Sequence, residues 1–173
     1  DAARVNLEAP LEYAPELWGE IVGMGWTGIG LPEAVGGAGL GIGAAVPVFE
    51  SMGRALMGTP LMSTLLAAQL LHRAAGDEAA EVLEKIAAGA AACVAELESE
   101  DWQGAQATRV DDQQRVHGQK RLVMDAQSAE FFVVVCDDGS SPALAVIGRG
   151  ALEDSAISPR VLIDHTHRAA DVA

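Results

Sequence analysis

The spacing of the apolar residues changes near residues 89–92, and this change most constrains the fold. Up to about Gly89, Ala, Leu and Met recur with helical spacing, whereas beyond it short runs of Val, Ile and Phe are separated by Asp, Gly, Ser and Pro. The chain has 173 residues, 50% of them apolar, which is enough to bury a core. We therefore predict an α+β protein with a helical domain at residues 1–90 and a small β domain at residues 91–173.

The first part contains four segments with the apolar stripe of a helix that packs on a core. In the first of them, Leu17, Ile21 and Met24 recur at i, i+4 and i+7. Glycine and proline then interrupt the pattern, as is typical of helix ends. The predicted helices begin near residue 10 and near residue 61, and cover about 42–56 and 77–88.

The second part reads as seven short strands joined by turns. Residues 131–136 form a continuous apolar run, which indicates a strand buried on both faces. Seven strands in about eighty residues favour a small barrel or sandwich. The predicted strands cover residues 91–97, 106–110, 113–117, 120–124, 130–136, 143–148 and 161–163.

The charge balance limits the partners of this chain. Its 25 acidic and 11 basic residues give a net charge of −14, which repels phosphate backbones, so we expect no nucleic-acid partner. The uncharged run at 55–71 is long enough to span a bilayer, but Gly58 and Pro60 interrupt it, and we predict no membrane span. Two cysteines and no visible signal peptide favour a reducing compartment, the cytoplasm.

Two patterns resemble ligand motifs but have simpler explanations. Gly23, Gly25 and Gly28 follow a predicted helix, whereas a dinucleotide fingerprint needs a strand before it, so these glycines are expected to serve turns and close packing. His165 and His167 alternate along the chain, but no third ligand with suitable spacing is evident, and we predict a surface pair and no metal site.

The cysteines and one acidic cluster are candidate reactive groups. Cys93 and Cys136 have no basic neighbour in sequence that would stabilise a thiolate, so both are expected to be small buried side chains. A dense acidic group follows residue 95 and could act as a metal site or general base, but it is more typical of a solvated strand end and loop. This group comprises Glu96, Glu98, Glu100 and Asp101.

Four stretches of the sequence resemble the acyl-CoA dehydrogenase family. Residues 25–40 carry the Pro-Glu and Gly-Gly-x-Gly core of a loop between early helices, and residues 49–54 carry a Glu followed by Gly-Arg. Residues 117–135 resemble the Asn-Gly-x-Lys strand pair of the family's β domain. Residues 164–172 are similar to the Asp-x-Thr-Arg-x-Ala-x-Val segment that closes it.

The resemblance implies an FAD-dependent α,β-dehydrogenation of an acyl-CoA thioester. Family members continue into a C-terminal helical domain that supplies the catalytic glutamate, so this sequence looks like a fragment and the catalytic residue remains unknown. The resemblance further implies FAD as cofactor, an acyl-CoA substrate, electron-transfer flavoprotein as acceptor, and assembly into homo- or hetero-oligomers.

The resemblance also places cofactor-binding positions, and here the sequence departs from the family. Ala95 and Glu96 align with a Leu-Thr-Glu segment, so the threonine hydroxyl is lost, and no Gly-Ser-Asp loop follows. Leu122, Val123 and Met124 align with Trp-Ile-Thr, so the tryptophan and the next hydroxyl are also lost. Two interpretations stay open: an active enzyme for a bulky or steroid-type acyl chain, or a non-catalytic subunit that supports a competent paralogue.

Overall fold

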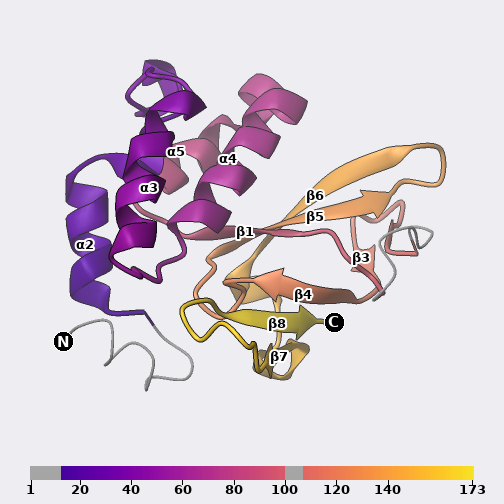
Figure 1. Cartoon of the computed structure of the whole chain (residues 1–173). Helices are drawn as coiled ribbons and strands as arrows, with labels where there is room; N and C mark the ends of the chain where they lie inside the picture. The colour runs from indigo at the N-terminus through magenta and orange to yellow at the C-terminus, as the bar shows by residue number, and fades with distance from the viewer. Residues whose placement is uncertain (1–12, 100–106) are drawn as a thin grey trace.

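The structure is a computed structural model that describes residues 13–99 and 107–173. Helices come first and strands second along the chain, so the predicted α+β class is confirmed. The helices gather on one side of the molecule and the strands on the other, and the two parts pack against each other (Figure 1). Nothing in the structure tests the boundary at residue 90, which stays a prediction.

The four predicted helical segments are all helical in the structure. The predicted start near residue 10 lies outside the described residues. The segments at 42–56 and 77–88 each begin with a 3-10 turn before the α-helix. The α-helices are α2 (Pro15–Gly23), α3 (Val46–Arg54), α4 (Leu61–Ala75) and α5 (Ala80–Ala87), and the 3-10 turns are η1 (Trp26–Gly28), η2 (Glu33–Val35), η3 (Ile42–Ala45), η4 (Gly76–Ala79), η5 (Arg149–Ala151) and η6 (Asp154–Ala156).

The strands form two sheets. One sheet has the order β1-β5-β2-β3, with β6 paired to β5, and the other has the order β4-β8-β7. Among the described residues these sheets do not close into a barrel, so a sandwich is the better description. The strands are β1 (Ala92–Ala95), β2 (Arg109–Val110), β3 (Val116–His117), β4 (Lys120–Met124), β5 (Phe131–Asp137), β6 (Pro142–Gly148), β7 (Ile157–Arg160) and β8 (Ala169–Val172).

The predicted strand at 161–163 is wrong. Val161 and Ile163 are fully exposed in a loop, and the strand before it is β7, which pairs with β8. Val161 and Ile163 are β-branched residues, which favour a strand, whereas β7 contains Pro159, a residue that is rare inside strands. Because β7 pairs only with β8, it is an edge strand, where a proline is tolerated.

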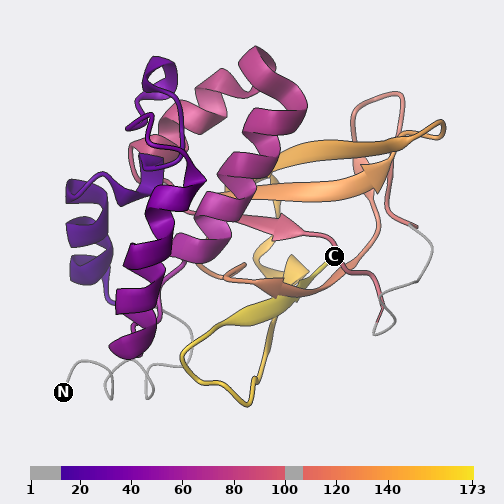
Figure 2. The ribbon, with the colours of Figure 1, turned by 45° about the horizontal axis from the view of Figure 1, so that its top comes forward.

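The prediction that 131–136 is buried on both faces is confirmed by β5. Val133 on one face packs with residues of α4 and α5, while Phe132 and Val134 on the other face pack between the two sheets. Strand β5 pairs with β1 and β2 in parallel and with β6 antiparallel. Figure 2 shows β5 and β6 beside α4, with the second sheet beneath them. One strand therefore joins the core under the helices to the core of the sandwich.

Of the three predicted glycines, Gly25 serves a turn and Gly28 a close approach, since a Cβ added to Gly28 would lie 3.1 Å from the Gly37 Cα, whereas nothing lies within 4 Å of one added to Gly23. Gly25 has a φ of 71°, in the left-handed region, where the chain turns out of α2. Gly37 lies so close to Leu31 that an added Cβ would be 2.2 Å from the Leu31 carbonyl oxygen. The left-handed turn at Gly25 and the close approach at Gly37 each favour glycine over any residue with a side chain.

The uncharged run at 55–71 is not one continuous helix. Helix α3 ends at Arg54, Gly58 and Pro60 lie in the connection, and α4 begins at Leu61. In the described part of the chain, no helix combines the length and the apolar character needed to span a membrane.

Candidate functional site

The structure places the five predicted cofactor-binding residues on β1, at its end and on β4. Ala95 and Val123 are buried between the two sheets, at 0% and 1% exposure. Glu96 and Leu122 are exposed, and Met124 is half-buried beside a pocket. Because successive strand residues face opposite sides, Leu122 and Met124 are the two side chains of this set that β4 turns away from the sandwich core.

The pocket beside Met124 lies where helix α4 meets the β domain. Its volume is about 280 Å³, and its lining is mostly apolar. Val94 was not predicted as a site residue, although it is the neighbour of Ala95 and the alternation of side chains along β1 places it on the opposite face. The pocket is lined by Met62, Ser63, Leu66, Val94, Met124, Asp125 and His167.

A second apolar pocket of about 230 Å³ lies on the other side of His167. Met62 and His167 line both pockets, while Phe49 and Met52 of α3 and Leu56 just after it also line the second one. The two histidines that were predicted as a surface pair differ in position. His167 lines both pockets, whereas His165 lines neither of them. In the described residues, no group of three metal-ligating side chains comes together.

Asp125 is a buried carboxyl at the edge of the first pocket, with 3% exposure. The Tyr13 and Ser63 hydroxyls both donate short hydrogen bonds to it. Burial raises the pKa of Asp125, although these bonds and the nearby His167 and Arg168 lower it in part. The sequence carries no signal that separates Asp125 from an ordinary turn residue after a strand.

Leu122 sits in a strained backbone conformation. Its φ is 50°, in the left-handed region, which costs a side-chain-bearing residue about 1–2 kcal/mol. The register between β4 and β8 shifts between Lys120 and Val123, which is a β-bulge. The Leu122 N–H donates to Asp171 Oδ1 at 3.1 Å, so a side chain on β8 satisfies the donor that the bulge takes out of the ladder.

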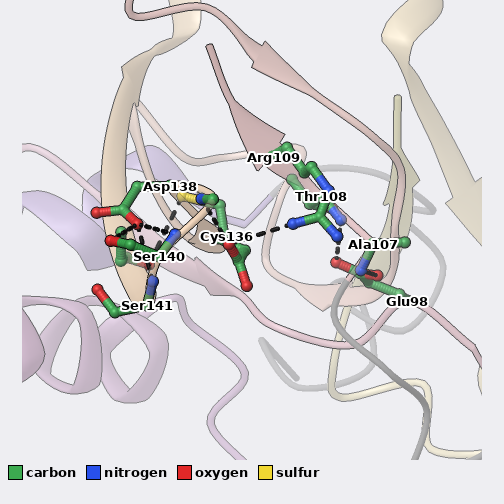
Figure 3. A network of polar contacts seen from close by, with 11 residues as sticks. Glu98, Ala107, Thr108, Arg109, Cys136, Asp138, Ser140 and Ser141 are labelled. Carbon is green, nitrogen blue, oxygen red and sulfur yellow. Dashed lines mark hydrogen bonds and ion pairs between the residues drawn. The ribbon is translucent and has the colours of Figure 1, made fainter. Parts of the chain in front are cut away.

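Glu98 is not a solvated loop residue, and this corrects the interpretation of the acidic group. Its side chain is 13% exposed and lies 2.6 Å from the buried Lys120 ammonium. It also accepts hydrogen bonds from the Ala107 and Thr108 N–H groups (Figure 3). Burial would raise its pKa, but these donors outweigh burial and lower it to about 2. Glu100 and Asp101 lie outside the described residues.

The two cysteines are buried and free, as predicted. Burial raises the pKa of both thiols, so neither is poised as a nucleophile.

Comparison with known proteins identifies the family. Residues 1–90 match the family model of the acyl-CoA dehydrogenase N-terminal domain. A curated relative, acyl-CoA dehydrogenase IpdE2 of Mycolicibacterium smegmatis, is 37% identical over 91 residues, which cover 52% of this chain and 28% of the relative.

Solved structures share the fold over almost the whole chain. The Tcur3481-Tcur3483 steroid ACAD G363A variant has a TM-score of 0.79 at 24% identity, covering 99% of this chain and 52% of that one. The ChsE4-ChsE5 complex of Mycobacterium tuberculosis has a TM-score of 0.78 at 20% identity, covering 98% and 47%. The chain thus spans about half the length of these structures and less of the curated relative. It belongs to the acyl-CoA dehydrogenase family, a family of oxidoreductases.

Proposed function

We propose that this chain forms the helical and β portions of an FAD-dependent acyl-CoA dehydrogenase that acts on a bulky or steroid-type acyl chain. The observation that carries the proposal is the apolar pocket where α4 meets β1 and β4. Met124, predicted from the resemblance as a cofactor-binding residue, lines this pocket together with Val94. One similar structure, which is named as a steroid ACAD, supports the substrate class.

The side chains that β1 and β4 turn away from the sandwich core fit the apolar part of a flavin. An isoalloxazine ring is flat and largely apolar, and Leu122, Met124 and Val94 offer it apolar surface. Side-chain hydroxyls are scarce at the pocket, because the Ser63 hydroxyl already donates to Asp125, while Ala95 faces the core between the two sheets. The polar edge of the ring would therefore depend on backbone groups or on other polypeptide.

FAD, when bound, would accept the hydride that leaves the β-carbon of the substrate, and this chain would bind and orient the ring and the acyl group. Among the residues that the structure describes, Asp125 is the carboxyl that lines the pocket. Two hydroxyls already hold it, and burial raises its pKa, so we assign it a structural role. The catalytic glutamate is expected outside this sequence.

The second apolar pocket supports a bulky acyl group. Met62 and His167 line both pockets, so the two pockets adjoin and together offer more room than either alone. We expect a cytoplasmic enzyme that passes electrons to an electron-transfer flavoprotein, and the two free thiols fit a reducing compartment.

The alternative is a subunit that lacks its own flavin and supports a competent paralogue. Leu122 and Met124 favour it, since neither supplies the aromatic ring or the hydroxyl that the family carries at these positions. Two structural neighbours, Tcur3481-Tcur3483 and the ChsE4-ChsE5 complex, are named as pairs, which also supports assembly as a hetero-oligomer.

The visible absorption spectrum of the purified protein tests these proposals. We expect a flavin spectrum from the protein alone. A spectrum seen only after co-expression with a second family member supports the composite subunit, and no flavin in either preparation contradicts both proposals. The double variant Leu122→Trp, Met124→Thr should raise flavin retention. The matched control Val161→Trp, Ile163→Thr makes the same change in a fully exposed loop and should leave retention unchanged.

A further inference from the structure

The strained residue of β4 is held by a charged side chain from another strand. Leu122 has a φ of 50° inside the β-bulge, and its N–H points to Asp171 Oδ1 on β8 at 3.1 Å. A hydrogen bond to a charged acceptor is stronger than a neutral one. Asp171 therefore favours the left-handed conformation that an isolated leucine avoids.

Asp171 is itself fixed in place. Arg160 on β7 donates to Asp171 Oδ2 at 2.5 Å, and the Asp171 side chain is 13% exposed. The Arg160 guanidinium, followed by the Leu122 N–H, holds the pKa of Asp171 below its usual range despite partial burial. The carboxylate thus stays charged at neutral pH, with one oxygen on β7 and the other on the bulge of β4.

We propose that Asp171 is a positioning residue for the cofactor face: by holding Leu122 in the bulge, it fixes which side chains β4 presents to an isoalloxazine ring. This role of Asp171 rests on the proposed function, in which Leu122 and Met124 face the flavin. Because strand side chains alternate in direction, a bulge that relaxed by one residue would turn the following side chains toward the opposite face. Leu122 and Met124 would then exchange places with the core residue Val123.

The test compares Asp171→Ala with Asp171→Asn, which keeps an acceptor oxygen for the Leu122 N–H. The control is Asp154→Ala, which removes another Asp–Arg ion pair, with Arg149, at a side chain that is fully exposed. The first measurement is hydrogen exchange at the Leu122 amide in flavin-free protein. The second is the dissociation constant for added FAD, together with the position of the visible flavin band.

For Asp171→Ala we expect exchange at Leu122 to rise about tenfold or more. We expect the FAD dissociation constant to rise at least fivefold and the flavin band to shift. Asp171→Asn should recover most of the protection and affinity, and Asp154→Ala should match the parent protein. The inference is overturned if Asp171→Ala keeps the parent's Leu122 protection, or if it binds FAD as the parent does. Failure of the proposed function looks different, since then neither the parent nor Asp154→Ala binds FAD.

Discussion

Asp125 is the residue whose loss we expect to destabilise the protein most directly. Its carboxyl accepts hydrogen bonds from Tyr13 ahead of α2 and from Ser63 on α4, and it follows β4, so it joins three segments. Asp125→Ala would leave both hydroxyls without this buried acceptor. We expect the free energy of unfolding to fall by about 2–4 kcal/mol in urea titrations. Ser63→Ala, which removes one donor, should cost less than half of that.

The pH dependence of this site has a defined sign. Burial raises the pKa of Asp125 in the folded state, so folding takes up a proton between the unfolded and folded pKa values. The stability from this group is full below the unfolded pKa and declines as pH rises through the folded pKa. Relative to Asp125→Asn, which does not titrate, the parent protein should gain stability from pH 7 to pH 4.5. A difference that is constant with pH would contradict the assignment.

At the scale of elements, Glu98 ties the end of β1 to the start of β2 and to β4. It pairs with Lys120 and accepts the Ala107 and Thr108 N–H groups. We expect Glu98→Gln to lower the free energy of unfolding by about 1–3 kcal/mol at pH 7. Glu81→Gln, in the exposed pair with Lys85, is the matched control and should have little effect.

Lowering the pH should reduce the loss of unfolding free energy that Glu98→Gln causes. This pH dependence is opposite in sign to that expected for Asp125. The folded pKa of Glu98 is lowered to about 2. The stability it provides is therefore present above its unfolded pKa and is lost as pH falls through about 2. Urea titrations of parent and variant between pH 5 and pH 2.5 should converge. Parallel curves over this range would show that the Lys120 contact does not depend on the charge of Glu98.

The elements differ in how far sequence could predict them, and the reason is the range of the interactions. Strand β5 was predictable because its apolar run reports burial on both faces directly. Strand β7 was not, since Pro159 is acceptable only because the strand lies at a sheet edge, a fact of topology. The candidate site shows the same division. Resemblance pointed to Leu122 and Met124, but Asp125 and Asp171 act through partners 62 and 49 residues away in sequence.

At the scale of the whole molecule, the helical and β parts share one core and meet again at the loop before β8. Leu71 and Ile86 of the helices pack with Val133 of β5 in a single cluster. The second contact is tight: a Cβ added to Gly58, between α3 and α4, would lie 2.1 Å from the Thr166 carbonyl oxygen. Because that oxygen belongs to the backbone, relief requires the loop that carries His167 to move.

Gly58→Ala should therefore loosen the contact between the two parts and disturb the wall between the pockets. We expect a loss of about 1–3 kcal/mol in the free energy of unfolding. The transition should remain single, with tryptophan fluorescence and far-UV circular dichroism coinciding, because the shared core still couples the parts. The control Gly53→Ala lies in α3 with no neighbour within 4 Å of the added Cβ, and should be neutral or stabilising. Equal stability of the two variants would mean that the loop before β8 can move without a cost in free energy. His167 would then not be held in a fixed position beside a substrate.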